Sequence, residues 1–213
     1  LPIITEVEAT VVDYRPKIDV TLDLHQPGMH NRLNAAAATA AARSIGIDAE
    51  TCVTALENFR GTWRRFEYKG TFLAAERGAI PVFDDYAHHP TEIRATIAGV
   101  REQYPGRHLT VVFQSHTYSR THELFTDFVT ALAQVDTVYL LPIYAAREEN
   151  TFGVTSEQIS DALKKKKVVT EVFATHGGAA ERVKETVPQG GIVVVMGAGD
   201  VTAVADILIK NTV

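Results

Sequence analysis

The sequence contains a single cysteine, Cys52, and no hydrophobic run that approaches the length of a membrane span. One cysteine cannot form an internal disulfide, which fits a reducing compartment, so we expect a cytoplasmic protein. The apolar run Ile192–Met196 has the length of a buried strand, whereas a membrane helix needs about 20 residues, so we expect no membrane insertion. No Gly-Lys dipeptide occurs either, which excludes a P-loop for a triphosphate within this chain.

Positive charge is also scarce. The chain has 21 Lys and Arg residues against 26 Asp and Glu residues, which gives a net charge of −5 and argues against nucleic acid as a partner. Its 213 residues, 46% of them hydrophobic, are enough for one large domain or one and a half. Because the sequence begins Leu-Pro-Ile-Ile, without Met or a secretory signal, we expect it to be a piece of a longer chain.

Strand-like and helix-like patterns alternate from residue 80 onward. The expected strands are apolar throughout, and each is followed by an amphipathic helix; they are Ile80–Asp84, Leu109–Phe113, Val138–Leu141, Val168–Phe173 and Ile192–Met196. Thr155 and Gln158 have the spacing of a capping box at the start of one of these helices. This alternation predicts an α/β domain whose doubly wound, mostly parallel sheet is covered on both faces.

The first sixty residues follow a different pattern. They predict two strands, Glu6–Tyr14 and Ile18–Leu24, then an Ala-rich helix, Asn34–Ser44, and a second helix near Glu50–Asn58. These elements are too few for a core of their own, so we interpret residues 1–60 as the trailing part of a domain and residues 61–213 as the next domain. Phe66–Ala75, centred on Lys69-Gly70, predicts a hairpin at the start of the second domain.

The densest polar cluster follows the first strand of the α/β domain. Asp84-Asp85-Tyr86-Ala87-His88-His89-Pro90 brings two carboxylates, a phenol and two imidazoles to the carboxyl end of a strand, where open α/β sheets bind ligands. The alternative is a helix cap, with His89 before the helix and Pro90 in its first turn. A metal site that uses both histidines is the weaker hypothesis.

A second polar loop, Gln114–Thr121, follows the next strand and adds His116 and Arg120 at the corresponding place. The planar guanidinium of Arg120 is suited to a carboxylate or a phosphate, although the loop's hydroxyl groups could serve only as helix caps. Gly197-Ala198-Gly199-Asp200 lacks the third small residue of a dinucleotide fingerprint, since position 202 is Thr202, and we expect a tight turn with Asp200 capping the last helix.

Two further segments carry candidate ligand contacts. Asn31 and Asn34 are three residues apart at the start of the Ala-rich helix, so both amides can face one side, where an amide can recognise an adenine edge or simply cap the helix. Trp63-Arg64-Arg65-Phe66-Glu67 lies at the expected domain junction. Its arginines fit interdomain salt bridges as well as ligand contacts.

Taken together, these motifs resemble those of the Mur ligases of peptidoglycan synthesis. The resembling motifs are PGMHNRLNAAAA, WRRFE, DDYAHHPTEI, FQSHTYSRT, YAAREEN and GAGDV, in the family's order. The resemblance implies the end of a central ATPase domain followed by a complete, Rossmann-like C-terminal domain. It also implies ATP-dependent addition of L-alanine to UDP-N-acetylmuramate through an acyl phosphate. ATP and Mg²⁺ would then be cofactors, with the P-loop and the metal ligands outside this chain.

By the same resemblance, each candidate residue receives a role. Asn31, Asn34, Arg65 and Asp85 are expected to contact ATP; Tyr86, His88, His116 and Arg120 are expected to hold the substrate; and Asp85, His88 and Arg120 are the catalytic candidates. This chain has Ser115-His116-Thr117 where many relatives have Pro-His-Arg, so carboxylate binding would depend more heavily on Arg120.

Three alternatives stay open. A related ligase that recycles a murein tripeptide onto UDP-N-acetylmuramate carries similar motifs. A stand-alone binding module could use Asp84 and Asp85 as an acidic pocket, although Pro142 and Gly197 stand where a receiver domain would need Asp and Lys. A metallohydrolase would bind zinc through His88, His89 and His116. The sequence does not indicate the oligomeric state.

Overall fold

The computed structural model describes residues 22–210, and the chain divides into two units between Arg60 and Gly61. The predicted strand Glu6–Tyr14 and most of the predicted strand Ile18–Leu24 lie outside the described residues. Nothing between residues 22 and 210 is a helix long and apolar enough to cross a membrane.

The described part of the first unit is a pair of helices, α1 (Met29–Ser44) and α2 (Ala49–Asn58). Helix α1 begins five residues before the predicted start at Asn34, because Gly28, with φ of 97°, turns the chain directly into the helix. Helix α2 is capped by Asp48, whose carboxylate accepts a hydrogen bond of 2.9 Å from the Thr51 amide. The buried side of the pair includes Ala35, Ala36 and Cys52.

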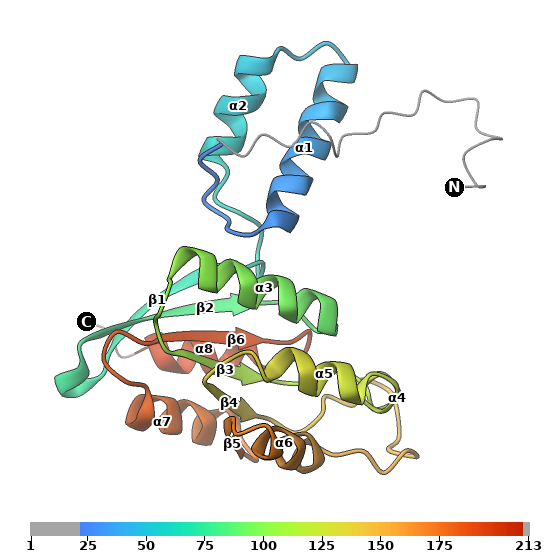
Figure 1. Cartoon of the computed structure of the whole chain (residues 1–213), viewed down its shortest axis with the longest axis vertical. Coiled ribbons are helices and arrows are strands. Elements are labelled where there is room, and N and C mark those ends of the chain that lie inside the picture. The colour runs from blue at the N-terminus through green and yellow to red at the C-terminus, as the bar shows by residue number, and fades with distance from the viewer. Residues whose placement is uncertain (1–21, 211–213) are drawn as a thin grey trace. The chain divides into compact units, whose positions relative to one another are not determined.

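The second unit is built around one six-stranded sheet (Figure 1). The strands are β1 (Glu67–Leu73), β2 (Ala79–Asp85), β3 (Leu109–Phe113), β4 (Thr137–Leu140), β5 (Val169–Val172) and β6 (Ile192–Met196). Their order is β1-β2-β6-β3-β4-β5, and every pair is parallel except β1 with β2. The predicted α/β fold with a mostly parallel sheet is therefore confirmed.

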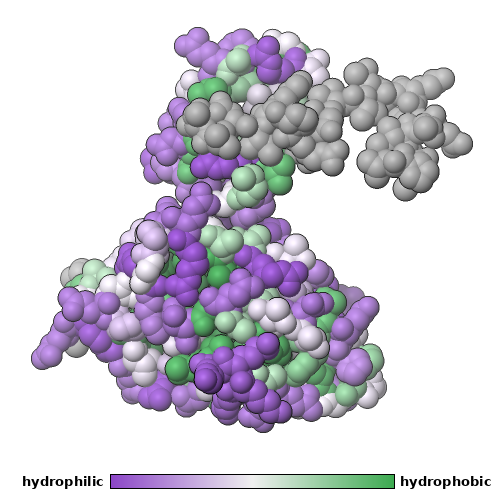
Figure 2. Space-filling view, in the orientation of Figure 1, coloured by the Kyte–Doolittle hydropathy of each residue, from purple (hydrophilic) through white to green (hydrophobic). Residues whose placement is uncertain are grey.

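Helices cover both faces of this sheet. They are α3 (Pro90–Gln103), α4 (Tyr118–Glu123), α5 (Phe125–Leu132), α6 (Ser156–Lys165), α7 (His176–Thr186) and α8 (Thr202–Ile209). Side chains of α3, α5 and α6 pack with Val111 and Phe113 on one face, and those of α7 and α8 pack with Val112 on the other. All residues of β3 and β6 are buried, as expected of central parallel strands. On the face that Figure 2 shows, this unit is mostly hydrophilic outside.

Two local predictions in this unit are wrong. Lys69-Gly70 is not a hairpin turn: both residues lie within β1, where the pairing register shifts between Tyr68 and Gly70 as in a β-bulge. The connection to β2 instead runs through a short 3₁₀ helix, η2 (Ala75–Arg77). Asp200 does not cap the last helix either, since its carboxylate lies 3.2 Å from the His176 Nε2.

Candidate functional site

Three loops meet at the carboxyl edge of the sheet, where the sequence predicted the site. The β2, β6 and β3 strands end side by side, with Asp85 opposite Met196 and Met196 opposite Phe113. Backbone hydrogen bonds continue past the strand ends, from the Gly197 amide to the Asp85 carbonyl and from the Gln114 amide to the Met196 carbonyl. The loops after these strands are therefore held next to one another, at the place where parallel α/β sheets bind ligands.

The bend at Gly197 explains the glycines of GAGDV. Gly197 has φ of 147°, and a Cβ there would lie 2.6 Å from the Gln114 carbonyl oxygen. At Gly199, a Cβ would lie 2.6 Å from the Gln114 side-chain oxygen and 2.8 Å from the Tyr144 ring. Both glycines are thus required by close approach of the neighbouring loops rather than by a bound phosphate.

Arg64 is a buried structural residue. Its side chain is 4% exposed, its Nε donates to the Asp84 carboxylate at 3.0 Å, and its Nη1 and Nη2 donate to the carbonyls of Gly199 and Gly197. The Asp84 carboxylate also accepts a hydrogen bond of 2.6 Å from the Thr202 hydroxyl. Burial raises the pKa of Asp84, against the opposing effects of Thr202 and Arg64. The salt bridge of Arg64 therefore lies within the second unit and not between domains, as the sequence had suggested.

Asp85 is buried with its carboxylate turned into the protein. Its oxygens accept hydrogen bonds from the amides of Phe66 and Ala87, at 3.0 and 2.8 Å, and from the Thr96 hydroxyl at 3.1 Å. Burial raises its pKa to about 6, although these hydrogen bonds favour the charged form. Asp85 thus fixes the backbone just after Arg65, and its predicted contact with ATP stays a prediction.

Tyr86 lies between two cations. The guanidinium carbon of Arg64 is 5.1 Å from the centre of its ring, and that of Arg65 is 5.9 Å away. Arg65 is half-exposed and also lies 3.6 Å from the Glu92 carboxylate, so it is free to reach a ligand at little cost. The other Glu92 oxygen accepts hydrogen bonds from the amides of His88 and His89.

The two adjacent histidines have different roles. His89 caps α3, because its ring accepts a hydrogen bond from the Thr91 amide and Glu92 completes a capping box, with Pro90 in the first turn. The His88 ring instead contacts the Tyr86 carbonyl at 2.9 Å. The helix-cap interpretation is therefore confirmed for His89, while the expected contact of His88 with the substrate stays a prediction.

His116 and His88 face each other across the loops. Their ring centres are 6.1 Å apart, and the His116 ring stacks on Tyr144 at 5.5 Å. Burial lowers the pKa of His116, and the positive charges of Arg120 and His88 lower it further. Within residues 22–210, no three His, Cys, Asp or Glu side chains are placed to hold a metal ion, so the zinc hypothesis gains no support.

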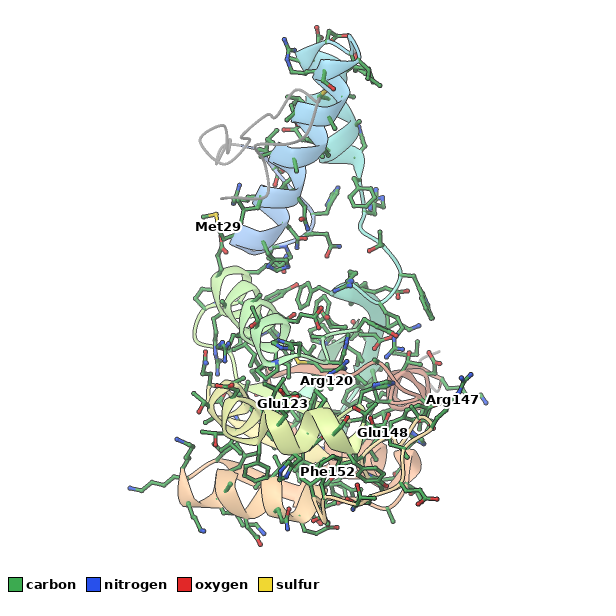
Figure 3. The ribbon with its side chains drawn as sticks, turned by 90° about the vertical axis from the view of Figure 1, so that its right-hand side faces the viewer. Met29, Arg120, Glu123, Arg147, Glu148 and Phe152 are labelled. Carbon is green, nitrogen blue, oxygen red and sulfur yellow. The ribbon has the colours of Figure 1, made fainter. Side chains whose placement is uncertain are left out.

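Arg120 lines a hollow of about 500 Å³ together with polar side chains from three segments. Figure 3 shows Arg120, Glu123 and Glu148 on the same side of the second unit. The other lining residues are His89, Thr117, Ser119 and Leu124. The Arg120 Nη1 is buried and has no hydrogen-bond partner in the described part of the chain. A buried donor of this kind needs an acceptor, which a ligand carboxylate or phosphate can supply.

Sequence reasoning assigned no role to Tyr144 and Glu148, although both belong to the quoted motif YAAREEN. Tyr144 pairs with His116 as an isolated β-bridge, and Glu148 accepts hydrogen bonds from Ser119. Their loop follows β4, so its position after a parallel strand and its place in this motif were the signals that could have identified them.

The candidate residues of the first unit lie in the first turns of α1. The Asn31 side-chain amide donates a hydrogen bond of 2.8 Å to the Pro27 carbonyl, and Asn34 is exposed. Three residues apart in a helix, they lie on neighbouring positions of one face, as the sequence predicted. Asn34 is free to contact a ligand, whereas one Asn31 donor is already used.

Comparison with known proteins gives a consistent result. Residues 64–199 match the family described as Mur ligase, glutamate ligase domain. The UDP-N-acetylmuramate–L-alanine ligase of Agathobacter rectalis is 42% identical over 196 residues, which cover 92% of this chain and 41% of that protein. The corresponding enzyme of Renibacterium salmoninarum is 44% identical over 186 residues, covering 86% and 37%.

A solved structure agrees. The UDP-N-acetylmuramate–alanine ligase of Thermotoga maritima superposes with a TM-score of 0.71 at 29% identity, covering 88% of this chain and 38% of that one. The chain thus spans about 40% of the length of the curated relatives that it matches. With the matched domain covering most of the second unit, the chain belongs to the Mur ligase family.

Proposed function

We propose that this chain is the C-terminal part of an ATP-dependent ligase that joins L-alanine to UDP-N-acetylmuramate in cytoplasmic peptidoglycan synthesis. Residues 1–60 would be the end of the central ATP-binding domain, and residues 61–213 the Rossmann-like C-terminal domain. The names of the most similar relatives support this assignment, and their greater length means that the activity belongs to a longer protein.

The observation that carries the proposal is the unpaired cation in the hollow. The buried Nη1 of Arg120 lacks a partner in the described chain, Arg120 lines the hollow, and its charge is close enough to His116 to lower the pKa of that ring. We propose that Arg120 binds the carboxylate of L-alanine or of the product, with Tyr86, His88 and His116 around it. Burial and the nearby charge of Arg120 lower the pKa of His116, which favours the neutral ring beside this cation.

ATP would supply a phosphoryl group that converts the muramate carboxylate into an acyl phosphate, from which phosphate leaves far more readily than oxide when an amine attacks the carbonyl carbon. We propose that Asn31 and Asn34 contact its adenine and that Arg65 contacts its phosphates, with Asp85 holding the backbone beside Arg65. No three ligating side chains in the described part of the chain are placed for a metal ion. We therefore propose that Mg²⁺ is bound by other parts of the full protein.

The test is a fusion of this chain to the N-terminal part of the Agathobacter rectalis ligase. We expect phosphate release that depends on ATP, UDP-N-acetylmuramate and L-alanine. Arg120→Ala should raise the KM for L-alanine roughly tenfold or more, because a charge-assisted contact is lost. Arg120→Lys is the matched control, which keeps the charge and loses the planar fork.

Other outcomes would change the assignment. Turnover with a murein tripeptide but not with L-alanine would identify the recycling ligase. An unchanged KM in Arg120→Ala would remove Arg120 from the carboxylate site. We also expect the reading frame to extend upstream of Leu1 and to encode a Gly-Lys-Thr or Gly-Lys-Ser loop; its absence would favour the binding module.

A further inference from the structure

Glu148 contacts the helix that carries Arg120, although the two residues come from different loops. One of its carboxylate oxygens accepts a hydrogen bond of 2.9 Å from the Ser119 amide, and the other accepts one of 2.5 Å from the Ser119 hydroxyl. The N-cap residue of α4, Thr117, makes no side-chain cap. Glu148 thus satisfies an amide in the first turn of α4 that would otherwise lack a partner.

The loop that carries Glu148 is fixed to the same region at other points. The Thr117 amide donates to the Tyr144 carbonyl and the Tyr144 amide donates to the Ser115 carbonyl, both at 2.9 Å. Further along, the Phe152 ring stacks on His122 of α4 at 5.0 Å. Figure 3 shows Phe152 on the same side of the unit as Arg120. The position of Glu148 is therefore determined by its whole loop.

Glu148 also brings a negative charge to the hollow, which Glu123 lines as well. His116 lies near Arg120 and His88, which disfavour its protonation, and Glu148 is the neighbour that favours it. Glu148 and Arg120 both line the hollow, yet no ion pair joins them. Because both Glu148 oxygens are directed at Ser119, the carboxylate balances the charge of Arg120 without occupying its donors.

We propose that Glu148 is a positioning residue, which holds the first turn of α4 and balances the nearby positive charge so that Arg120 stays unpaired and open to a substrate carboxylate. This inference rests on the proposed function, since it assumes that Arg120 receives such a carboxylate. A residue that only capped a helix would affect folding, whereas Glu148 also raises the pKa of His116, against the larger effects of burial and Arg120.

The test uses the 213-residue chain and two NMR readouts, the titration of the His116 ring and the shift of the Arg120 Nε–H signal when L-alanine is added. Glu148→Gln keeps a side chain of the same shape and removes the charge. We expect it to lower the pKa of His116 and to weaken L-alanine binding roughly tenfold. Glu149→Gln makes the same charge change at an exposed neighbour and should leave both readouts unchanged.

Ser119→Ala tests the hydrogen bonding of Glu148 separately from its charge. It removes one of the two hydrogen bonds and keeps the Glu148 carboxylate, so we expect weaker L-alanine binding with little change in the titration of His116. An unchanged His116 titration in Glu148→Gln would overturn the inference. If that titration responds but L-alanine never shifts the Arg120 signal, even in the unaltered chain, the carboxylate site of the proposed function is wrong instead.

Discussion

The buried pair of Arg64 and Asp84 provides the sharpest test of what holds this edge of the sheet. Arg64→Met removes the guanidinium and leaves Asp84, which is 0% exposed, with Thr202 as its remaining partner. It also leaves the carbonyls of Gly197 and Gly199 without their donor. Breaking a buried ion pair from one side costs about 3–5 kcal/mol, so we expect a loss of that size in the free energy of unfolding.

The measurement is urea unfolding followed by circular dichroism. Arg64 lowers the pKa of Asp84, so in Arg64→Met this carboxyl should take up a proton more readily, and the loss should be smaller at pH 5 than at pH 8. Arg65→Met is the matched control: its side chain is 56% exposed and its ion pair is 3.6 Å long, so we expect a change below about 1 kcal/mol. Equal losses in the two variants would refute a structural role for Arg64.

Three further predictions concern the same loops. The pKa of Asp85 rises from 3.8 to about 6 on folding, so this group should make the second unit less stable, by roughly 2 kcal/mol, as pH increases from 4 to 6; a carboxyl signal that titrates below 4 in NMR would contradict this. Gly197→Ala should cost about 2–3 kcal/mol in urea unfolding because its Cβ meets a carbonyl oxygen, whereas Gly177→Ala, in open helical space, should cost nothing; equal values would count against the clash. Thr117 has φ of 66°, so Thr117→Gly should raise the thermal midpoint by relieving up to about 1 kcal/mol of strain, and an unchanged or lower midpoint would show that the residue is unstrained.

The sheet could be predicted from the sequence because its central strands are buried on both faces. Ile192–Met196 is an unbroken apolar run and Leu109–Phe113 is interrupted only by Thr110, and the bounds of both strands in the structure are the predicted ones. The edge strand was harder to predict. Gly70 interrupts β1 with a bulge, and a Cβ there would contact Ile209, which lies far along the chain. The dipeptide Lys69-Gly70 is compatible with a turn as well as with a bulge, so the sequence alone could not distinguish the two.

The same limit applies to the candidate site. Its location followed from the rule that ligands bind at the carboxyl ends of parallel strands, which requires only the order of strands and loops. Its internal contacts depend on residues that are distant in sequence: Arg64 binds a carbonyl 135 positions away, and Glu148 binds Ser119 29 positions away. Neither contact leaves a local pattern in the sequence. The partners of Arg64 and of Glu148 could therefore not be assigned from the sequence alone.

The two adjacent aspartates show how such contacts separate structural from ligand-facing residues. Because consecutive strand residues point to opposite faces, Asp84 and Asp85 hold different parts of one segment, the Arg64 side chain and the Phe66 amide. Both acids are buried, and together they hold the two neighbours of Arg65, which is itself half-exposed. The acidic half of DDYAHHP therefore positions a cation, and Tyr86 and His88 are the residues of this motif that we propose for ligand binding.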